Sequence, residues 1–427
     1  MAMITEGLTP KMERIQGERF GAEGLFALSK FIIPVQTETV GKIDYTAHII
    51  RRSENPQLGA ELAQGEKRQM IMLSGLDTLG QDWLRMASQL MTDMPDVEQL
   101  TLLDHPSTSG VRHERRDVAL NTNSFENSAK VISTAMERLV EQGEMKTGQT
   151  AVGISTGCAV LEELAAFNPK MIDTMVLCAP AGMLDRTEEK IMKGGAQGGS
   201  QYLKEFFLDL KNRFLSRFSK DKRTLPKGEP IGVVRSIPKV GKEQIPDELK
   251  KPIRFSNFMF EVVFKALRKF PNFYQHFTGM WGDSDPHVPI LTADYKKDLS
   301  LVAKNTTKDA CEKISGKRVV LALGMEDQAV PPQEFLTAED SSAVAQISDP
   351  NEKSEKTIDL IIRNLKQRFP NNADTTVMLG IAGPVNHVQE KTNTEIWGPM
   401  ITNILEPIQP QMSLSGDALK QWFGKSN

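Results

Sequence analysis

The stretch "GQTAVGISTGCAVLEELAAFNP", residues 148–169, combines three local patterns. It starts with an apolar run, passes through a Gly-x-Ser-x-Gly motif centred on Ser155, and continues as a segment rich in alanine and leucine. This order predicts a buried strand, a tight turn and a helix. At such a turn the serine takes a strained backbone conformation, and Gly153 and Gly157 let the strand and the helix close around it. We therefore predict that Ser155 is a nucleophile, with a serine in an ordinary glycine turn as the alternative.

Similar apolar runs recur along the chain and alternate with helix-like segments such as residues 124–142. The continuous runs are "QMIMLSG" (69–75), "VEQLTLLD" (97–104), "QTAVGIS" (149–155), "IDTMVLCAP" (172–180), "RVVLALG" (318–324) and "TTVMLGIAG" (375–383). Alternation of this kind predicts an α/β fold, with a mostly parallel sheet covered by helices on both faces. Before these runs, residues 31–40 and 42–50 alternate partly around a glycine turn, which predicts an antiparallel pair.

Composition narrows the classes of function. The chain has 427 residues, 39% of them hydrophobic, which is more than one compact domain usually needs. A net charge of -3 and a pI near 6.2 argue against a nucleic-acid partner. Three scattered cysteines predict neither a disulfide framework nor a metal cluster. The N-terminal residues lack the order of a signal peptide and no apolar run is long enough to span a membrane, so we expect a cytoplasmic protein without an integral membrane segment.

A nucleophilic serine requires a general base and an acid that orients it. The apolar run 375–383 leads into a loop that carries His387, and the run 318–324 leads into Glu326 and Asp327. We predict His387 as the base and Asp327 as the acid.

A second segment imitates an acid loop and has to be weighed against Asp327. "GDSDPHVP" contains Asp285 and His287, but the residues before it do not form an aliphatic strand. We therefore prefer Asp327 to Asp285 and to its neighbour Glu326, and we expect His287 to be a loop or lid residue.

With these motifs in the order Ser, Asp, His, residues 31–405 resemble the α/β-hydrolase superfamily. "MLSGLDTLGQDW" is similar to the oxyanion loop of that family, with Ser74-Gly75 where His-Gly is usual, and "LLDHPSTSG" is similar to the loop after the following strand. The resemblance implies that the backbone N–H groups of Leu76 and Thr156 form the oxyanion hole. It implies neither a metal nor an organic cofactor.

The resemblance also implies a helical lid, inserted between the strand after the elbow and the strand that carries the acid. Residues 183–316 interrupt the strand-helix alternation and hold most of the phenylalanines, so we predict hydrolase core at 1–182, lid at 183–316 and core again at 317–427. Phe214 and Phe264 are predicted to line an apolar substrate pocket, with lid core as the alternative. Transient contact of the basic, aromatic lid with a lipid surface is a further, less favoured interpretation.

These residues together predict a serine hydrolase that cleaves a carboxylic ester or thioester with an apolar acyl group, through an acyl-enzyme. The partner is then a small-molecule acyl substrate, which His105 contacts unless it is only a loop histidine. An acyltransferase or peptidase with the same triad stays open, as does a non-catalytic ligand-binding module. The oligomeric state is not encoded in any of these patterns.

Overall fold

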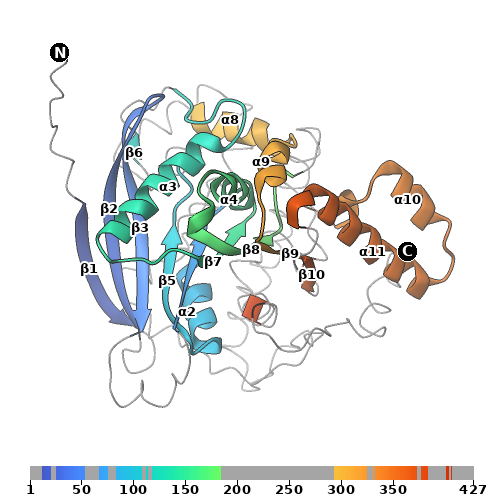
Figure 1. Cartoon of the computed structure of the whole chain (residues 1–427), viewed down its shortest axis with the longest axis horizontal. Helices are drawn as coiled ribbons and strands as arrows, with labels where there is room; N and C mark the ends of the chain where they lie inside the picture. The colour runs from blue at the N-terminus through green and yellow to red at the C-terminus, as the bar shows by residue number, and fades with distance from the viewer. Residues whose placement is uncertain are drawn as a thin grey trace, which may run out of the picture.

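The computed structural model describes residues 12–20, 26–52, 67–75, 83–107, 112–113, 118–183, 293–324, 330, 332–372, 377–382, 401–402 and 405. Within these ranges the strands form one ten-stranded sheet in the order β1-β2-β3-β5-β4-β7-β8-β9-β10, with β6 paired to β3 (Figure 1). The strands are β1 (Glu13–Phe20), β2 (Phe26–Thr37), β3 (Gly41–Arg52), β4 (Arg68–Leu73), β5 (Val97–Leu103), β6 (Arg112–His113), β7 (Gln149–Ile154), β8 (Ile172–Cys178), β9 (Arg318–Gly324) and β10 (Val377–Ala382).

The sheet divides into a parallel part and an antiparallel part. From β5 through β4, β7, β8 and β9 to β10, every neighbouring pair is parallel, which confirms the predicted mostly parallel sheet. β2 and β3 pair antiparallel around the turn before Gly41, as expected for residues 31–50. β1, which no sequence pattern predicts, lies antiparallel against β2 at the edge of the sheet.

Helices cover both faces of this sheet. Along β4, Ile71 and Leu73 join one buried apolar cluster, whereas Met70 and Met72 join another, because successive side chains of a strand point to opposite faces. The first cluster includes side chains of α3, α4, α9 and α11, and the second includes those of α2. The α-helices are α2 (Leu84–Asp93), α3 (Glu126–Glu141), α4 (Thr156–Phe167), α8 (Ala293–Val302), α9 (Lys308–Lys313), α10 (Ala338–Ala345) and α11 (Pro350–Arg368).

Most of the predicted lid, residues 184–292, lies outside the described residues. The described end of the predicted range consists of α8 and α9. Leu301 of α8 and Cys311 of α9 are buried in the same apolar cluster as α4, so this end of the range packs on the sheet domain. The lid and its boundaries stay a prediction.

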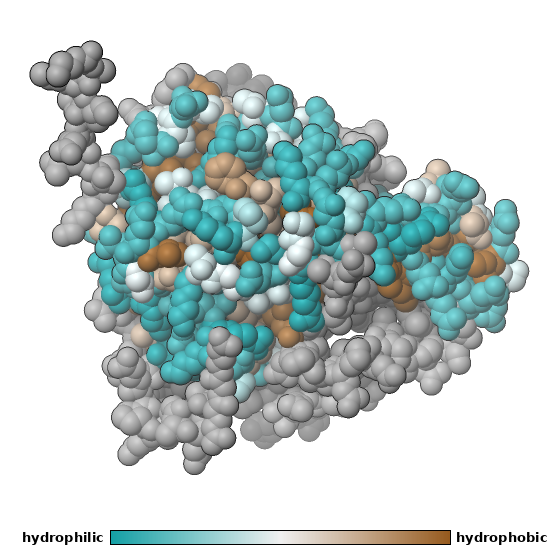
Figure 2. All heavy atoms as spheres, viewed as in Figure 1, coloured by the Kyte–Doolittle hydropathy of each residue, from teal (hydrophilic) through white to brown (hydrophobic). Residues whose placement is uncertain are grey.

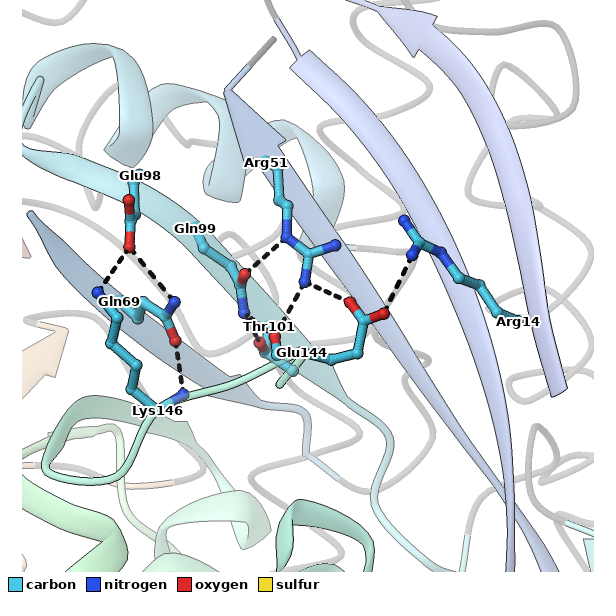
Figure 3. A network of polar contacts seen from close by, with 8 residues as sticks. All are labelled: Arg14, Arg51, Gln69, Glu98, Gln99, Thr101, Glu144 and Lys146. Atoms are coloured by element: carbon cyan, nitrogen blue, oxygen red, sulfur yellow. Dashed lines mark hydrogen bonds and ion pairs between the residues drawn. The ribbon is translucent and has the colours of Figure 1, made fainter. Parts of the chain in front are cut away.

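The amino ends of the parallel strands meet at a network of charged and amide side chains. Glu144, in the turn between α3 and β7, accepts hydrogen bonds from Arg14 of β1 at 3.0 Å and Arg51 of β3 at 2.7 Å. Figure 3 shows eight residues of the network, namely Arg14, Arg51, Gln69, Glu98, Gln99, Thr101, Glu144 and Lys146. Side chains of β1, β3, β4 and β5 thus contact the turn before β7, at the Glu144 and Lys146 side chains and at the backbone carbonyl of Glu144 and the backbone N–H of Lys146.

The face of the molecule seen in Figure 2 is mainly hydrophilic where the structure describes it. Among the described residues, the exposed large apolar side chains are Ile15 at 44% and Phe167 at 52%. None of the described helices combines the length and the apolar composition that crossing a membrane requires.

Candidate active site

Ser155 occupies a strained turn between β7 and α4. Its backbone dihedrals are φ 54° and ψ -120°, a region that residues with a side chain rarely adopt. The turn lies at the carboxyl ends of the parallel strands, where ligands bind in open α/β sheets. The strand, turn and helix predicted from residues 148–169 are therefore all present.

The glycines on each side of Ser155 are required by close backbone contacts. A Cβ atom at Gly157 would lie 2.5 Å from the carbonyl oxygen of Leu73 and 2.6 Å from that of Ser74. A Cβ atom at Gly153 would lie 2.9 Å from the Cα atom of Cys158. Such separations are well inside van der Waals contact, and the neighbours are backbone atoms that cannot rotate away. The Gly-x-Ser-x-Gly pattern therefore has a steric cause in this fold.

Backbone hydrogen bonds hold the strained serine from both sides. The Ser155 N–H donates to the carbonyl oxygen of Cys178 at 2.9 Å, and the Ser155 carbonyl oxygen accepts from the N–H groups of Cys158 and Ala181, both at 3.1 Å. Ala179 lies in the chain between Cys178 and Ala181, the two residues that contact Ser155 at the end of β8, and it also has a positive φ, of 45°. This turn after β8 was not predicted from the sequence, because its contacts are made through the backbone and leave no side-chain pattern.

The segment after β4 approaches Ser155 from the other side. A Cβ atom at Gly75 would lie 3.0 Å from the Ser155 Cβ atom and 3.7 Å from its Oγ atom. Because Gly75 has no side chain, the segment after β4 can approach Ser155 without a clash. Leu76, the first predicted oxyanion donor, lies outside the described residues. Thr156, the second, is the first residue of α4 and is buried, and N–H groups at the start of a helix carry a partial positive charge.

The two other predicted triad residues, Asp327 and His387, lie outside the described residues. The strands that precede them are described, and they run parallel, with Gly324 of β9 opposite Ala382 of β10. Since β9 is also parallel to β8, and β8 to β7, the chain leaves β9 and β10 at the same edge of the sheet as Ser155. Both predicted partners therefore follow strands that end at the edge of the sheet where Ser155 lies.

His105 is the one predicted pocket residue that the structure describes. Its side chain is completely buried and its ring meets Phe125 edge to face at 6.0 Å between centroids. Its Nδ1 atom accepts from the Ser107 N–H at 3.3 Å and lies 3.9 Å from a carboxylate oxygen of Asp298. His105 is therefore part of the interior behind the loop, and a direct contact with substrate remains a prediction. Phe214 and Phe264 lie outside the described residues, as do Asp285, His287 and Glu326.

A buried ion pair anchors α4 behind the elbow. Arg368 of α11 lies 3.4 Å from a carboxylate oxygen of Glu162, and Thr307 donates to the same oxygen. Burial raises the pKa of Glu162, while the charge of Arg368 and the hydrogen bond from Thr307 act in the opposite direction. Arg368 also donates to the carbonyl oxygen of Met183 at 2.8 Å, so it ties the segment after β8 to the same helix.

Among the described residues, no group of three or more histidine, cysteine or acidic side chains is arranged to hold a metal ion. Cys158, Cys178 and Cys311 are all buried, and none of the three forms a disulfide. The described groups at the elbow include the hydroxyl group of Ser155, backbone N–H groups and closely packed glycines.

Comparison with known proteins gives a likeness of fold at low sequence identity. No protein-family model matches the chain, and no curated protein matches its sequence. Solved structures do match. An esterase from Exiguobacterium antarcticum is 11% identical with a TM-score of 0.43, and the match covers 87% of this chain and 99% of the esterase.

Two further structures match over a similar extent. A peroxisomal α/β-hydrolase from Saccharomyces cerevisiae is 11% identical with a TM-score of 0.43, over 96% of this chain and 93% of that one. A putative lipase from Acinetobacter baumannii is 15% identical with a TM-score of 0.41, over 88% and 91%. The fold assignment rests on this chain's own sheet order and strained serine turn.

Proposed function

We propose that this chain, whose fold is that of an α/β-hydrolase, is a serine hydrolase that cleaves a carboxylic ester or thioester with an apolar acyl group. Ser155 is the nucleophile, His387 the general base and Asp327 the acid that orients the base. The backbone N–H groups of Leu76 and Thr156 bind the oxyanion. The reaction proceeds through an acyl-enzyme that water hydrolyses.

Each group has a defined task in this mechanism. His387 accepts the proton of the Ser155 hydroxyl as the oxygen attacks the acyl carbonyl, and then gives a proton to the leaving group. Asp327 holds the imidazole in the required tautomer and stabilises the cation that forms. Two backbone donors stabilise the developing oxyanion, and one such donor contributes about 3 to 4 kcal/mol in other serine hydrolases.

The observation that supports this proposal best is the strained conformation of Ser155. A φ of 54° at a residue with a side chain is costly, and here hydrogen bonds to Cys178 and Ala181 maintain it. An ordinary turn would place a glycine at that position and avoid the cost. Retention of a serine where glycine fits better is the expected result if the hydroxyl group has a chemical role.

The proposal is tested by labelling the purified protein with a fluorophosphonate probe, which reacts with activated serines. Wild type is expected to become labelled, and Ser155→Ala is expected to lose both labelling and ester hydrolysis while it stays folded. Ser133→Ala is the matched control, because Ser133 is also buried but accepts its hydrogen bond from Asn168 at the far end of α4. A folded wild-type protein that does not label would support the ligand-binding alternative and overturn the proposal.

The acyl specificity is tested with esters of graded chain length. We expect activity to rise by roughly fourfold per methylene until the pocket is full, because each buried methylene contributes about 0.8 kcal/mol. Phe214→Ala and Phe264→Ala are expected to lose activity on long esters and keep it on short ones. Equal loss on both, with a lower melting temperature, would assign these rings to lid core. Adding alcohol or amine acceptors, or a peptide substrate, separates hydrolysis from acyl transfer and peptidase activity.

A further inference from the structure

Ser74 differs from the residue that the oxyanion loop of the family usually carries, and its hydroxyl group has a specific partner. The side chain lies directly after β4 and is 1% exposed. Its Oγ atom accepts a hydrogen bond from the backbone N–H of His105 at 2.9 Å. That N–H belongs to the segment after β5, so the hydroxyl group connects the carboxyl ends of two neighbouring parallel strands.

The donor on the other side of this bond is fixed in place. The His105 side chain is fully buried, its Nδ1 atom accepts from Ser107, and its ring packs against Phe125 of the segment before α3. A backbone N–H held in this way has little freedom to turn toward another acceptor. Removal of the Ser74 hydroxyl group would leave this donor buried and without the acceptor it uses here, which is costly.

The backbone of Ser74 is also held on two sides. Its N–H donates to the Leu103 carbonyl oxygen at 3.1 Å, which extends the pairing of β4 and β5. Its own carbonyl oxygen faces α4 so closely that a Cβ atom at Gly157 would lie 2.6 Å away. Ser74 is thus packed between the segment after β5 and the first turn of α4.

The next residue, Gly75, lies against the nucleophile, so the position of Ser74 affects the surroundings of Ser155. A Cβ atom at Gly75 would be 3.0 Å from both the Ser155 Cβ atom and the Ile154 carbonyl oxygen. A small shift of Ser74 would therefore change the distance between Gly75 and Ser155. Because the amide nitrogen of Leu76 is bonded directly to Gly75, the same shift would displace the proposed oxyanion donor.

We propose that Ser74 is a positioning residue for ester hydrolysis, whose hydroxyl group holds Gly75 against Ser155 through its bond to the backbone N–H of His105. This inference rests on the proposed function of Ser155. A displacement of an oxyanion donor weakens the transition state more than the ground state, so the effect falls on kcat rather than on KM.

The test compares Ser74→Ala with Ser133→Ala, since each removes a buried hydroxyl group that accepts a hydrogen bond from an N–H. We expect Ser74→Ala to lower kcat and the rate of fluorophosphonate labelling by about tenfold or more, with little change in KM. Ser133→Ala is expected to keep the wild-type kcat. Equal kcat values and labelling rates for the two folded variants would overturn the inference.

A second variant keeps the test decisive if Ser74→Ala does not fold. Ser74→Cys keeps an acceptor at the same position, although the thiol is somewhat larger and accepts more weakly. We expect a kcat between those of wild type and Ser74→Ala, whereas Ser133→Cys should match wild type. A wild-type kcat in folded Ser74→Cys would then overturn the inference. If wild type itself neither labels nor hydrolyses esters, the proposed function fails first and the inference falls with it.

Discussion

The two ends of the parallel strands are built by opposite means. At the amino ends, the turn before β7 is held by side chains, with Glu144 accepting hydrogen bonds from Arg14 and Arg51 (Figure 3). At the carboxyl ends, Ser155 is held by backbone hydrogen bonds and by the absence of side chains at Gly153 and Gly157.

This difference affects how the two ends tolerate substitution. A half-exposed ion pair contributes little to the free energy of unfolding, because water replaces much of the lost interaction. A close approach between backbones has no such replacement, since an added Cβ atom forces the strand and helix apart. Substitutions should therefore be tolerated less well at the carboxyl ends of the strands, as expected of a site that must hold a strained serine.

The largest effect is expected at the proposed acid. Asp327→Asn should lower kcat by about 10⁴-fold, because the asparagine would favour the wrong imidazole tautomer of His387. The measurement is turnover of a short ester by the folded variant. Asp285→Asn is the control and should keep near wild-type turnover; the reverse pattern would move the acid away from the carboxyl end of β9.

The next effect tests the backbone contacts themselves. Gly157→Ala should lower the free energy of unfolding by roughly 3 kcal/mol and reduce activity, because its Cβ atom would overlap the Leu73 and Ser74 carbonyl oxygens. Gly143 is the matched control from the amino-end turn, with φ 71° and no atom within 4 Å of an added Cβ. Gly143→Ala should lower the free energy of unfolding by about 1 kcal/mol, from backbone strain alone. Urea denaturation measures both values, and equal costs would remove the contrast between the two ends.

A third prediction concerns a carboxyl group on α4 in unfavourable surroundings. Burial, reinforced by the charge of Glu126, raises the pKa of half-buried Glu163 to about 7. The folded state therefore binds this proton more tightly than the unfolded state, and the resulting stability is complete below about pH 4.5 and lost as the pH rises to 7.

Glu163→Gln cannot ionise, so it should match wild type at acid pH and exceed it above neutral pH. We expect the gain to be on the order of 1 kcal/mol after allowance for solvent screening. The check is the difference in melting temperature between the two proteins at about pH 4 and pH 8. A difference that does not change with pH would contradict the assignment.

The smallest effect is expected at the amino-end network. Glu144→Gln removes the negative charge that faces Arg14 and Arg51, whose side chains are 46% and 30% exposed. The free energy of unfolding should fall by about 0.5 kcal/mol, and this decrease should be smaller at about 1 M salt because exposed charges are then screened. Ester turnover should not change. A loss as large as that of Gly157→Ala would show that the amino end is as sensitive as the carboxyl end.

Local patterns predicted much of this molecule. The apolar runs became β4, β5, β7, β8, β9 and β10, because a strand buried on both faces needs continuous apolar residues. The turn at Ser155 was predictable because the glycines that it needs are its own neighbours in the sequence. The edge strand β1 was missed, since a short polar segment carries little pattern of its own.

The sequence by itself therefore determined the layered α/β fold and the serine turn, both of which leave a pattern within short stretches of sequence. Only the tertiary structure decided that the turn after β8 holds Ser155 through Cys178 and Ala181, and that Ser74 bonds the backbone of His105. Those contacts join residues far apart in the chain, mostly through backbone atoms that every residue type possesses. Side-chain patterns cannot encode which N–H meets which carbonyl, because the strand order of the sheet brings them together.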